Sequence, residues 1–328
     1  MKHGLVSVLV LNHDGTVHLP ECLETLRAQT YPQIEIIVID NGSTDSSWEI
    51  CAQYEGVTFL ELGYNWGFGR GNNEGSKQAQ GEFLFFVNND MRFKPDVISI
   101  LVHKIQQDDS IFALDIKHYD WDGASVNHAA LRFKRGGWRS LLCPFVDWFE
   151  VDVQDMVPVP WANGASLFCR ADRFHELGGF DSTFFIDYED ADLCWRAWLR
   201  GWKTYYVPEA QCYHKKGATF SAGGRLSSAR SNHWTLWKRR RYYSGQKNRV
   251  RFAMKTMSGK VNLLVFLRNH LFAMAFLLLG RRVNASVMVC SWWANVAELL
   301  EILAQRRRIL TQSRLSSEDL IQAFWWKS

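Results

Sequence analysis

Carboxylate and amide side chains follow directly after several apolar runs of this sequence, where they could support chemistry. The run Phe83–Val87 is wholly apolar, and Asn88, Asn89 and Asp90 come immediately after it. A short apolar run of this kind is typical of a strand buried inside a parallel sheet. Because open α/β sheets bind ligands just beyond the carboxyl ends of their strands, Asp90 is a candidate to meet a ligand or a metal ion. The alternative is a plain turn in which Asp90 caps the segment that follows.

Polar clusters of the same type occur at other points of the chain. They are Asn12 with Asp14, Asp40 with Asp45, and Glu189 with Asp190. The carboxyl ends of parallel strands share one edge of a sheet, so these clusters can converge on a single crevice. Each cluster also has a structural interpretation, because Asp45 could cap a helix and acidic residues at 189–192 could stabilise a helix N-terminus.

The elements that must position these residues alternate in type along the first hundred residues. Strand-like runs at 6–11, 34–39, 57–62 and 83–87 are separated by segments that predict helices at 16–29, 43–54 and 66–80. Strands that alternate with helices through short connections indicate right-handed βαβ units and a parallel sheet. We therefore expect an α/β fold with a mainly parallel central sheet.

The alternation of predicted strands and helices is less regular after Asp90. The sequence predicts a helix at 95–107, strands at 111–119, 158–168 and 203–207, and helices at 173–177 and 189–198. Residues 120–157 are rich in Trp, Gly, Asp and Arg without a clean period, which is typical of a long loop.

The charge of the chain is strongly asymmetric. Residues 225–328 contain 19 of the 38 Lys and Arg residues but only 4 of the 34 Asp and Glu residues, so this region carries +15 and the preceding residues carry −11. A basic C-terminal region beside an acidic body indicates an anionic partner, which could be phospholipid, a lipid-linked pyrophosphate or nucleic acid.

An apolar segment at 261–279 approaches the length of a membrane span, but Arg268, Asn269 and His270 interrupt it. Such residues are unfavourable at the centre of a bilayer, and a basic helix with apolar faces is better suited to lie in the membrane interface. The alternative is a helical subdomain that packs on the rest of the protein.

Two other site classes are disfavoured. The seven cysteines include no CxxC pair, and most have apolar neighbours, so we expect reduced core residues. The glycine cluster at 67–71 reads GxGxG and does not follow the first strand, which argues against a dinucleotide-binding loop.

The motifs taken together resemble family 2 glycosyltransferases of GT-A fold, and most of all the bacterial rhamnosyltransferase-like enzymes that build cell-surface polysaccharides. The resemblance rests on Val6–Asn12, Asp40-Asn41-Gly42-Ser43-Thr44-Asp45, Asn65-x-Gly67-Phe68-x-x-Gly71-Asn72, Asn88-Asn89-Asp90, Gly178-Gly179-Phe180-Asp181 and Glu189-Asp190-x-Asp192-Leu193-Cys194-x-Arg196. It covers about residues 4–220, and a Tyr-Tyr-x-x-x-Lys-Asn pattern at 242–248 fits more loosely. It implies a GT-A domain at 1–224 and a basic helical region at 225–328 that docks on a membrane or an acceptor.

The resemblance implies a binding site for a nucleotide-diphosphate sugar. Its donor-binding residues would be Asn12, Asp40, Asn65, Arg70, Asn89 and Asp90. Asp40 would accept a hydrogen bond from the imide of uracil or thymine, and Arg70 would place positive charge near phosphate. Asp90, with His214 as a possible second ligand, would hold Mg²⁺ or Mn²⁺. His214 could equally be an ordinary structural histidine.

For the transfer step, the resemblance implies that Asp190 is the general base, paired with Glu189. Asp192 and Trp161 are candidates to contact the acceptor. Without the resemblance, the acids at 189–192 would be assigned only to the electrostatics of a helix N-terminus.

The implied activity is inverting transfer of a sugar from a dTDP- or UDP-linked donor to a glycan or a polyprenyl-pyrophosphate-linked acceptor. Rhamnose is the expected sugar, and the expected place is the cytoplasmic face of the cell membrane, with no nucleic-acid partner. The rival interpretations are a nucleotide-sugar-binding protein without transfer activity and a nucleic-acid binder that uses the basic tail.

Overall fold

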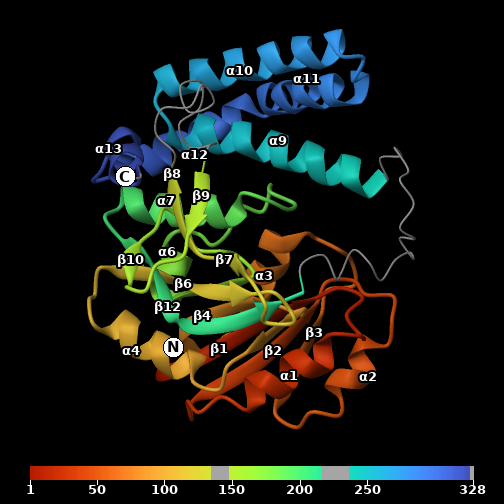
Figure 1. The fold of residues 1–328 in the computed structure, drawn as a ribbon, viewed down its shortest axis with the longest axis vertical. Coiled ribbons are helices and arrows are strands. Elements are labelled where there is room, and N and C mark those ends of the chain that lie inside the picture. The colour runs from red at the N-terminus through yellow and green to blue at the C-terminus, as the bar shows by residue number, and fades with distance from the viewer. Residues whose placement is uncertain (134–147, 216–235, 326–328) are drawn as a thin grey trace.

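The computed structural model describes residues 1–133, 148–215 and 236–325 (Figure 1). A ten-stranded mixed sheet forms the centre of the α/β part, and its main strand order is β10-β12-β6-β11-β4-β1-β2-β3. A layer of helices from the C-terminal region lies above this part, as Figure 1 shows.

The first half of the sheet is parallel, as the alternation of strand and helix predicts. Its elements are β1 (Lys2–Asn12), α1 (Leu19–Arg27), β2 (Ile34–Asp40), α2 (Ser47–Cys51), β3 (Val57–Glu61), α3 (Phe68–Ser76) and β4 (Gly81–Asn88). β1 lies between β2 and β4, and its register pairs Asn12 with Asp40 and Leu11 with Asn88. The polar ends of three strands therefore meet at one edge.

The second half departs from a purely parallel sheet. It contains β5 (Met91–Phe93), α4 (Val97–Gln106), β6 (Ile111–Tyr119), β11 (Ser166–Arg170), α6 (Ala171–Glu176), α7 (Glu189–Leu199) and β12 (Lys203–His214). β11 runs antiparallel between β4 and β6, while β6 and β12 are parallel to each other. Because β11 is reversed, its first residues lie at the edge where β4 and β6 end.

Several predicted boundaries need correction. The expected loop at 120–157 contains β7 (Val126–His128), β8 (Ala130–Phe133), β9 (Trp148–Val151) and the start of β10 (Val157–Pro158). The expected strand at 158–168 begins only at Ser166, and the last strand continues to His214 instead of ending at 207. α2 begins at Ser47, and Asp45 in the loop before it accepts a hydrogen bond from the loop after β1, as described below.

Two apolar cores cover the two faces of the sheet. Alternate residues of β1 point to opposite faces, so Val8 packs with α1 and α4 whereas Leu9 packs with α6 and α7. The core that contains Leu9 also includes buried residues of α9, and this packing joins the C-terminal helices to the α/β part. The sheet is thus buried on both faces, as expected for strands composed of unbroken apolar runs.

The C-terminal region is helical, as predicted. It contains α9 (Leu236–Thr256), α10 (Gly259–Leu278), α11 (Arg282–Ala297), α12 (Leu299–Thr311) and α13 (Ser317–Ala323). α10 and α11 form a hairpin beside α9 (Figure 1). The predicted boundary at 224/225 lies outside the described residues.

Part of the positive charge of this region is balanced within the chain. Lys255 of α9 is buried, and its Nζ lies 2.6 Å from Asp181 Oδ2 and 2.7 Å from Asp192 Oδ1. Arg251, which is fully buried, pairs with Glu298 and Glu301 in the helical layer. The basic α9 therefore packs on an acidic surface of the α/β part instead of extending freely into solvent.

Candidate active site

The candidate site lies at the sheet edge where β1, β2, β4, β6 and β12 end and where β11 begins. Asn12, Asp40 and Asn88 are the last residues of their strands, and His214 is the last residue of β12. Just before β11, the Ala165 carbonyl accepts a hydrogen bond from the Asn88 N–H at 3.0 Å. The predicted convergence of polar clusters on one edge is present in the structure.

Asn12, Asp40 and Asn89 form one hydrogen-bonded cluster. The Asn12 amide donates to Asp40 Oδ1 at 3.1 Å, and the Asn89 amide donates to Asn12 Oδ1 at 2.8 Å. Asp40 Oδ2 accepts from the Ser43 N–H at 3.1 Å. All three predicted residues are buried, so the cluster is preformed. Each carboxylate oxygen has two lone pairs, so Asp40 keeps capacity to accept from a ligand.

Asp45 shapes the adjacent loop, in agreement with the capping alternative. Its Oδ1 accepts from the Ser47 N–H at 3.1 Å, and its Oδ2 accepts from the Thr16 N–H at 3.0 Å. The first contact lies in the first turn of α2, and the second holds the loop after β1. These hydrogen bonds move the start of α2 to Ser47, later than the sequence predicts.

Asn65 and Arg70 border this cluster on the side of α3. The Asn41 amide donates to Asn65 Oδ1 at 3.3 Å, which ties the loop before α3 to the end of β2. The Arg70 guanidinium lies 3.5 Å from the centroid of the Trp66 ring and is half-buried. Stacking on an indole holds a guanidinium in place while leaving its N–H groups able to donate to phosphate.

Asp90 and His214, the two candidate metal ligands, lie side by side in the structure. His214 Nε2 lies 3.3 Å from Asp90 Oδ1, and Asp90 Oδ1 is buried and accepts no hydrogen bond from the residues that the structure describes. Within 1–133, 148–215 and 236–325, no group of three His, Cys, Asp or Glu side chains could hold a metal ion. One carboxylate and one imidazole therefore fit Mg²⁺ or Mn²⁺ only if a bound diphosphate supplies further oxygen ligands.

Asp190 is held at the same edge by backbone amides. Its Oδ2 accepts from the Gly164 N–H at 2.9 Å, and its Oδ1 accepts from the Ala191 N–H at 2.7 Å. Gly164 lies just before β11, so Asp190 joins the edge that also carries Asp90. Burial raises the pKa of Asp190, although these two N–H groups act in the opposite direction, and the charge of Asp187 raises it further. A raised pKa makes Asp190 a better proton acceptor.

Glu189 is almost fully buried beside Asp190. Burial raises the pKa of Glu189 well above its ordinary value, and the neighbouring Asp190 carboxylate adds to the rise. Two adjacent acids in one buried site resist simultaneous ionisation. Glu189 in its neutral form would leave the negative charge on Asp190, which is the form that a general base requires.

The two predicted acceptor residues have mainly structural surroundings. Asp192 is fully buried and pairs with Arg196 Nε at 2.8 Å as well as with Lys255. The Trp161 ring is about nine-tenths buried and lies 5.6 Å from the Phe133 ring, measured between centroids. Asp192 and Trp161 therefore lie next to the site, but Asp192 forms buried ion pairs and Trp161 packs against another aromatic ring.

Sequence reasoning missed a carboxylate–imidazole pair that supports Gly164. Asp115 of β6 is fully buried, accepts from the Asn163 N–H at 3.0 Å and lies 2.8 Å from His128 Nε2. Burial alone would lower the pKa of His128, but Asp115 and Glu150 raise it to about 10. The signal was available, because Asp115 is a lone carboxylate inside the apolar run at 111–116.

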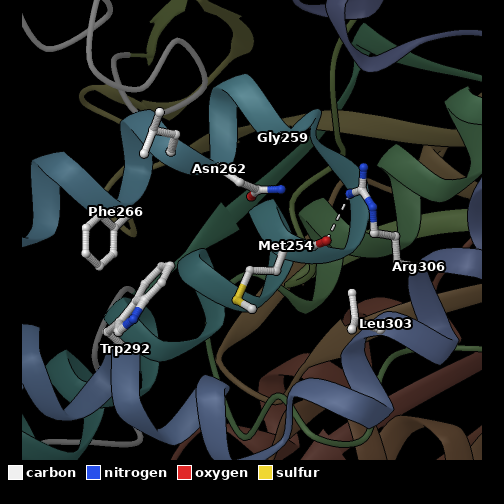
Figure 2. A pocket seen from close by; sticks show the side chains of 8 residues that line it. Met254, Gly259, Asn262, Phe266, Trp292, Leu303 and Arg306 are labelled. Atoms are coloured by element: carbon white, nitrogen blue, oxygen red, sulfur yellow. Dashed lines mark hydrogen bonds between the residues drawn. The ribbon is translucent and has the colours of Figure 1, made fainter.

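A separate cavity of about 350 Å³ lies within the C-terminal helical layer (Figure 2). All its lining residues belong to α9–α12: Met254, Gly259, Asn262, Leu263, Phe266, Trp292, Leu303 and Arg306. Figure 2 shows Phe266 and Trp292 on one side and Arg306 on the other, where Arg306 Nη1 donates to the Met254 carbonyl at 2.9 Å. No strand residue lines this cavity, so it is distinct from the candidate active site.

Comparisons with known proteins show which proteins this chain resembles. The sequence model of glycosyl transferase family 2 matches residues 7–152, and that of glycosyl transferase family group 2 matches residues 87–303. The chain is 30% identical over 235 residues to the N-acetylglucosaminyl-diphospho-decaprenol L-rhamnosyltransferase of Mycobacterium tuberculosis, covering 65% of this chain and 76% of that protein. It is 25% identical over 227 residues to rhamnosyltransferase WbbL of Escherichia coli, covering 64% and 83%.

Solved structures show the same fold. The mannosyltransferase PcManGT of Pyrobaculum calidifontis, solved in complex with GDP-Man and Mn²⁺, superposes with a TM-score of 0.53 at 16% identity. The match covers 94% of this chain and 83% of that chain. At this identity the likeness concerns the fold alone, and it confirms the predicted GT-A fold.

Proposed function

We propose that this chain, which belongs to glycosyl transferase family 2, transfers a rhamnosyl group from a thymidine-diphosphate donor to a lipid-linked glycan, with inversion. That the chain is a glycosyltransferase follows from its family. The sugar and the acceptor are proposed because both rhamnosyltransferase relatives share about two thirds of this chain. The observation that carries the chemical proposal is one amide-bound carboxylate, Asp190, at the sheet edge that also carries Asp90.

The donor would lie along the ends of β1, β2 and β4. Asp40 and Asn12 offer acceptors for the base, and Arg70 offers positive charge for the diphosphate. Asp90 and His214 would hold Mg²⁺ or Mn²⁺, which supplies charge neutralisation for the leaving diphosphate when bound. The hydrogen bond between the Asn89 and Asn12 side chains would hold this cluster in shape before the donor arrives.

The transfer step needs one base. The acceptor hydroxyl oxygen forms a bond to the anomeric carbon, the bond from that carbon to the diphosphate oxygen breaks, and the hydroxyl proton moves to Asp190. The nucleoside diphosphate leaves with the electron pair of the broken bond. A single displacement of this kind inverts the anomeric configuration. Burial raises the pKa of Glu189, so Glu189 would be the neutral member of the pair and Asp190 the charged acceptor of the proton.

The proposal is tested by incubating the full-length protein with Mn²⁺ and a panel of nucleotide sugars, with a synthetic polyprenyl-diphosphate glycan as acceptor. We expect released dTDP with dTDP-rhamnose and little release from UDP- or GDP-sugars. Asp90→Ala should lower turnover strongly, and its residual activity should need a higher Mn²⁺ concentration to reach half of its maximum. Asp109→Ala is the control and should behave as wild type, because Asp109 is an exposed acid just before β6, at the opposite end of that strand from the site. No nucleoside diphosphate release from any donor contradicts the proposal.

We also propose that α10 docks on the inner face of the cell membrane. Among the described residues, α10 is the single helix long and apolar enough to cross a bilayer, and α11 and α12 meet that test only as a pair bent by 72°. The buried face of α10 is mixed, since it holds Arg268 and Asn269 together with Val261, Val265 and Ala273, whereas its exposed face is apolar. Arg268 and Asn269 are buried, and Asn269 Oδ1 accepts from Arg249 of α9 at 3.0 Å. The exposed face carries Leu263, Leu267, Leu271, Met274, Leu277 and Leu278.

An apolar exposed face and a mixed buried face match a helix whose inner side meets protein and whose outer side meets lipid. Lys260 at the start of α10 and Arg281 and Arg282 after its end are exposed, which suits a surface of anionic headgroups. A helix lying in the interface would bury its leucine face in lipid, keep Asn269 against α9 and leave Arg268 buried within the protein. It avoids placing these two polar residues in the bilayer core, the difficulty noted for a spanning segment.

Co-sedimentation with phosphatidylglycerol vesicles tests the docking. Leu267→Ser with Leu271→Ser should release the protein from vesicles, whereas Val17→Ser with Trp48→Ser, which changes two exposed apolar residues of the α/β part, should not. Equal binding of both double variants contradicts the proposal. A wild-type protein that forms dimers through the leucine face, and becomes monomeric in the first variant without loss of vesicle binding, also contradicts it.

A further inference from the structure

The backbone just before α7, the helix that carries Asp190 and is called the catalytic helix below, has an unusual conformation. Asp187 and Tyr188 have backbone φ angles of 70° and 77°, which lie in the left-handed region that residues other than glycine rarely adopt. Tyr188 is the N-cap residue of α7 and makes no capping hydrogen bond with its side chain. Such a conformation persists only where surrounding contacts hold it. Asp190 follows two residues later, so these two backbone angles set its position.

The contacts that hold this segment come from α9. The Asn248 amide donates to the Ile186 carbonyl at 3.0 Å and to the Asp187 carbonyl at 2.8 Å. The Ser244 hydroxyl donates to the same Ile186 carbonyl at 2.9 Å, and Arg241 pairs with the Asp187 carboxylate at 3.2 Å. Positions 241, 244 and 248 share one face of α9, because three- and four-residue spacings place side chains one above another.

The other side of the segment contacts the loop before α3. The Phe68 N–H donates to the Phe185 carbonyl at 2.9 Å. Gly67 has a φ angle of 81°, and a Cβ atom there would lie 2.3 Å from the Phe185 oxygen, so only glycine permits this approach. The segment 185–188 is therefore enclosed between a loop that borders the donor site and the C-terminal helix α9.

A second contact braces α7 beyond Asp190. Lys255, seven residues after Asn248 on the same face of α9, pairs with Asp192. α9 thus contacts the catalytic helix both before and after the proposed base. This arrangement gives the Tyr-Tyr-x-x-x-Lys-Asn pattern at 242–248 a physical role that the sequence did not reveal.

We propose that Asn248 is a positioning residue for the transfer reaction. By donating to two successive backbone carbonyls, it fixes the left-handed turn from which α7 starts and so places the Asp190 carboxylate. Asn248 is buried with 1% of its surface exposed, and it lies in α9 outside the sheet edge that carries the donor site. The proposal deepens the proposed function, because it assumes that Asp190 is the base.

Asn295 of α11 provides a matched control. It is fully buried, and its amide donates to the carbonyls of Lys247 at 3.0 Å and Ser291 at 2.8 Å. Asn248→Ala and Asn295→Ala therefore remove the same side chain with the same number of backbone hydrogen bonds from the same helical layer. They differ in that only Asn248 contacts the segment before α7.

The experiment compares kinetics of both variants, corrected for the folded fraction measured by circular dichroism. We expect Asn248→Ala to lower kcat by roughly 10- to 100-fold, the range for a small misplacement of a catalytic group, with little change in the donor KM. Asn295→Ala should keep the wild-type kcat. Ser244→Ala, a milder change at the same carbonyl, should give a smaller loss and decides the matter if Asn248→Ala does not fold. Wild-type kcat in Asn248→Ala, or in Ser244→Ala where Asn248→Ala does not fold, overturns the proposal.

Hydrogen–deuterium exchange gives a readout that does not depend on activity. Amides of residues 186–192 should exchange faster in Asn248→Ala than in wild type, and Asn295→Ala should leave them unchanged. If the wild-type protein shows no transfer with any donor while this exchange difference is present, the proposed function fails and the positioning contact stands. If wild-type transfer is present and exchange at 186–192 is the same in all three proteins, the positioning proposal fails.

Discussion

Replacement of Asp190 by asparagine is the sharpest test of the proposed chemistry. The carboxylate accepts one N–H on each oxygen, from Gly164 and from Ala191. Asparagine keeps the size of the side chain but replaces one oxygen with an amide that donates. One of the two backbone N–H groups then loses its acceptor, which lowers stability by about 1–3 kcal/mol. Relief from burying a charge whose pKa is raised offsets part of this loss.

The effect on catalysis should be much larger than the effect on stability. A positioned general base contributes about 10²- to 10⁴-fold, so kcat should fall by that factor, and the donor affinity should change little because Asp190 would contact the acceptor side. Isothermal titration with dTDP and Mn²⁺ measures donor binding, and dTDP release measures turnover.

Asp172→Asn is the matched control for this substitution. Asp172 is also the second residue of a helix, and its Oδ1 accepts from the next N–H at 2.7 Å, the same distance as in Asp190. It is exposed and belongs to α6. The control should keep wild-type turnover. A folded Asp190→Asn variant with wild-type kcat, or with a large loss of dTDP binding at unchanged kcat, refutes the assignment of Asp190 as the base.

Three further outcomes follow from charge and burial. Because the pKa of buried Glu189 is raised on folding, its stabilising contribution is present at low pH and is lost as pH rises. Glu189→Gln should therefore match wild type in urea unfolding at pH 4 and exceed it by more than about 1 kcal/mol at pH 8; a gain at pH 4 alone contradicts this. Asp187→Asn should move the acid limb of the kcat–pH profile to lower pH, because the charge of Asp187 raises the pKa of Asp190. Lys255→Met should lower the free energy of unfolding by about 3–5 kcal/mol, because it leaves the buried Asp181 and Asp192 carboxylates without their partner. Lys104→Met, which removes a surface ion pair, should lower it by at most about 1 kcal/mol. Equal losses in the two variants would show that burial of the pair is unimportant.

The sequence was sufficient to predict the parallel half of the sheet and the meeting of its polar ends. Apolar runs that stop at Asn12, Asp40 and Asn88 specify both the strands and the edge, because strand period and chain alternation are local signals. The reversed direction of β11 was not predictable in this way. A buried strand of five residues has the same pattern whether its neighbours are parallel or antiparallel.

The role of α9 was also beyond local sequence signals. Its basic residues predicted an external anionic partner, yet Lys255 pairs with Asp181 and Asp192, more than sixty residues earlier in the chain. Burial alone would raise the pKa of Asp181, but Lys255 and hydrogen bonds from Thr183 hold it well below its usual value. Contacts of this kind depend on the tertiary fold, so composition could reveal the charge asymmetry but not its partner.

The configuration of the transferred sugar tests the central claim most directly. In the proposed reaction, Asp190 is the base for a single displacement at the anomeric carbon. Nuclear magnetic resonance of the product made from dTDP-rhamnose should show an anomeric configuration opposite to that of the donor, with Asp190→Asn forming the same product far more slowly. A product that retains the configuration of the donor would contradict the account.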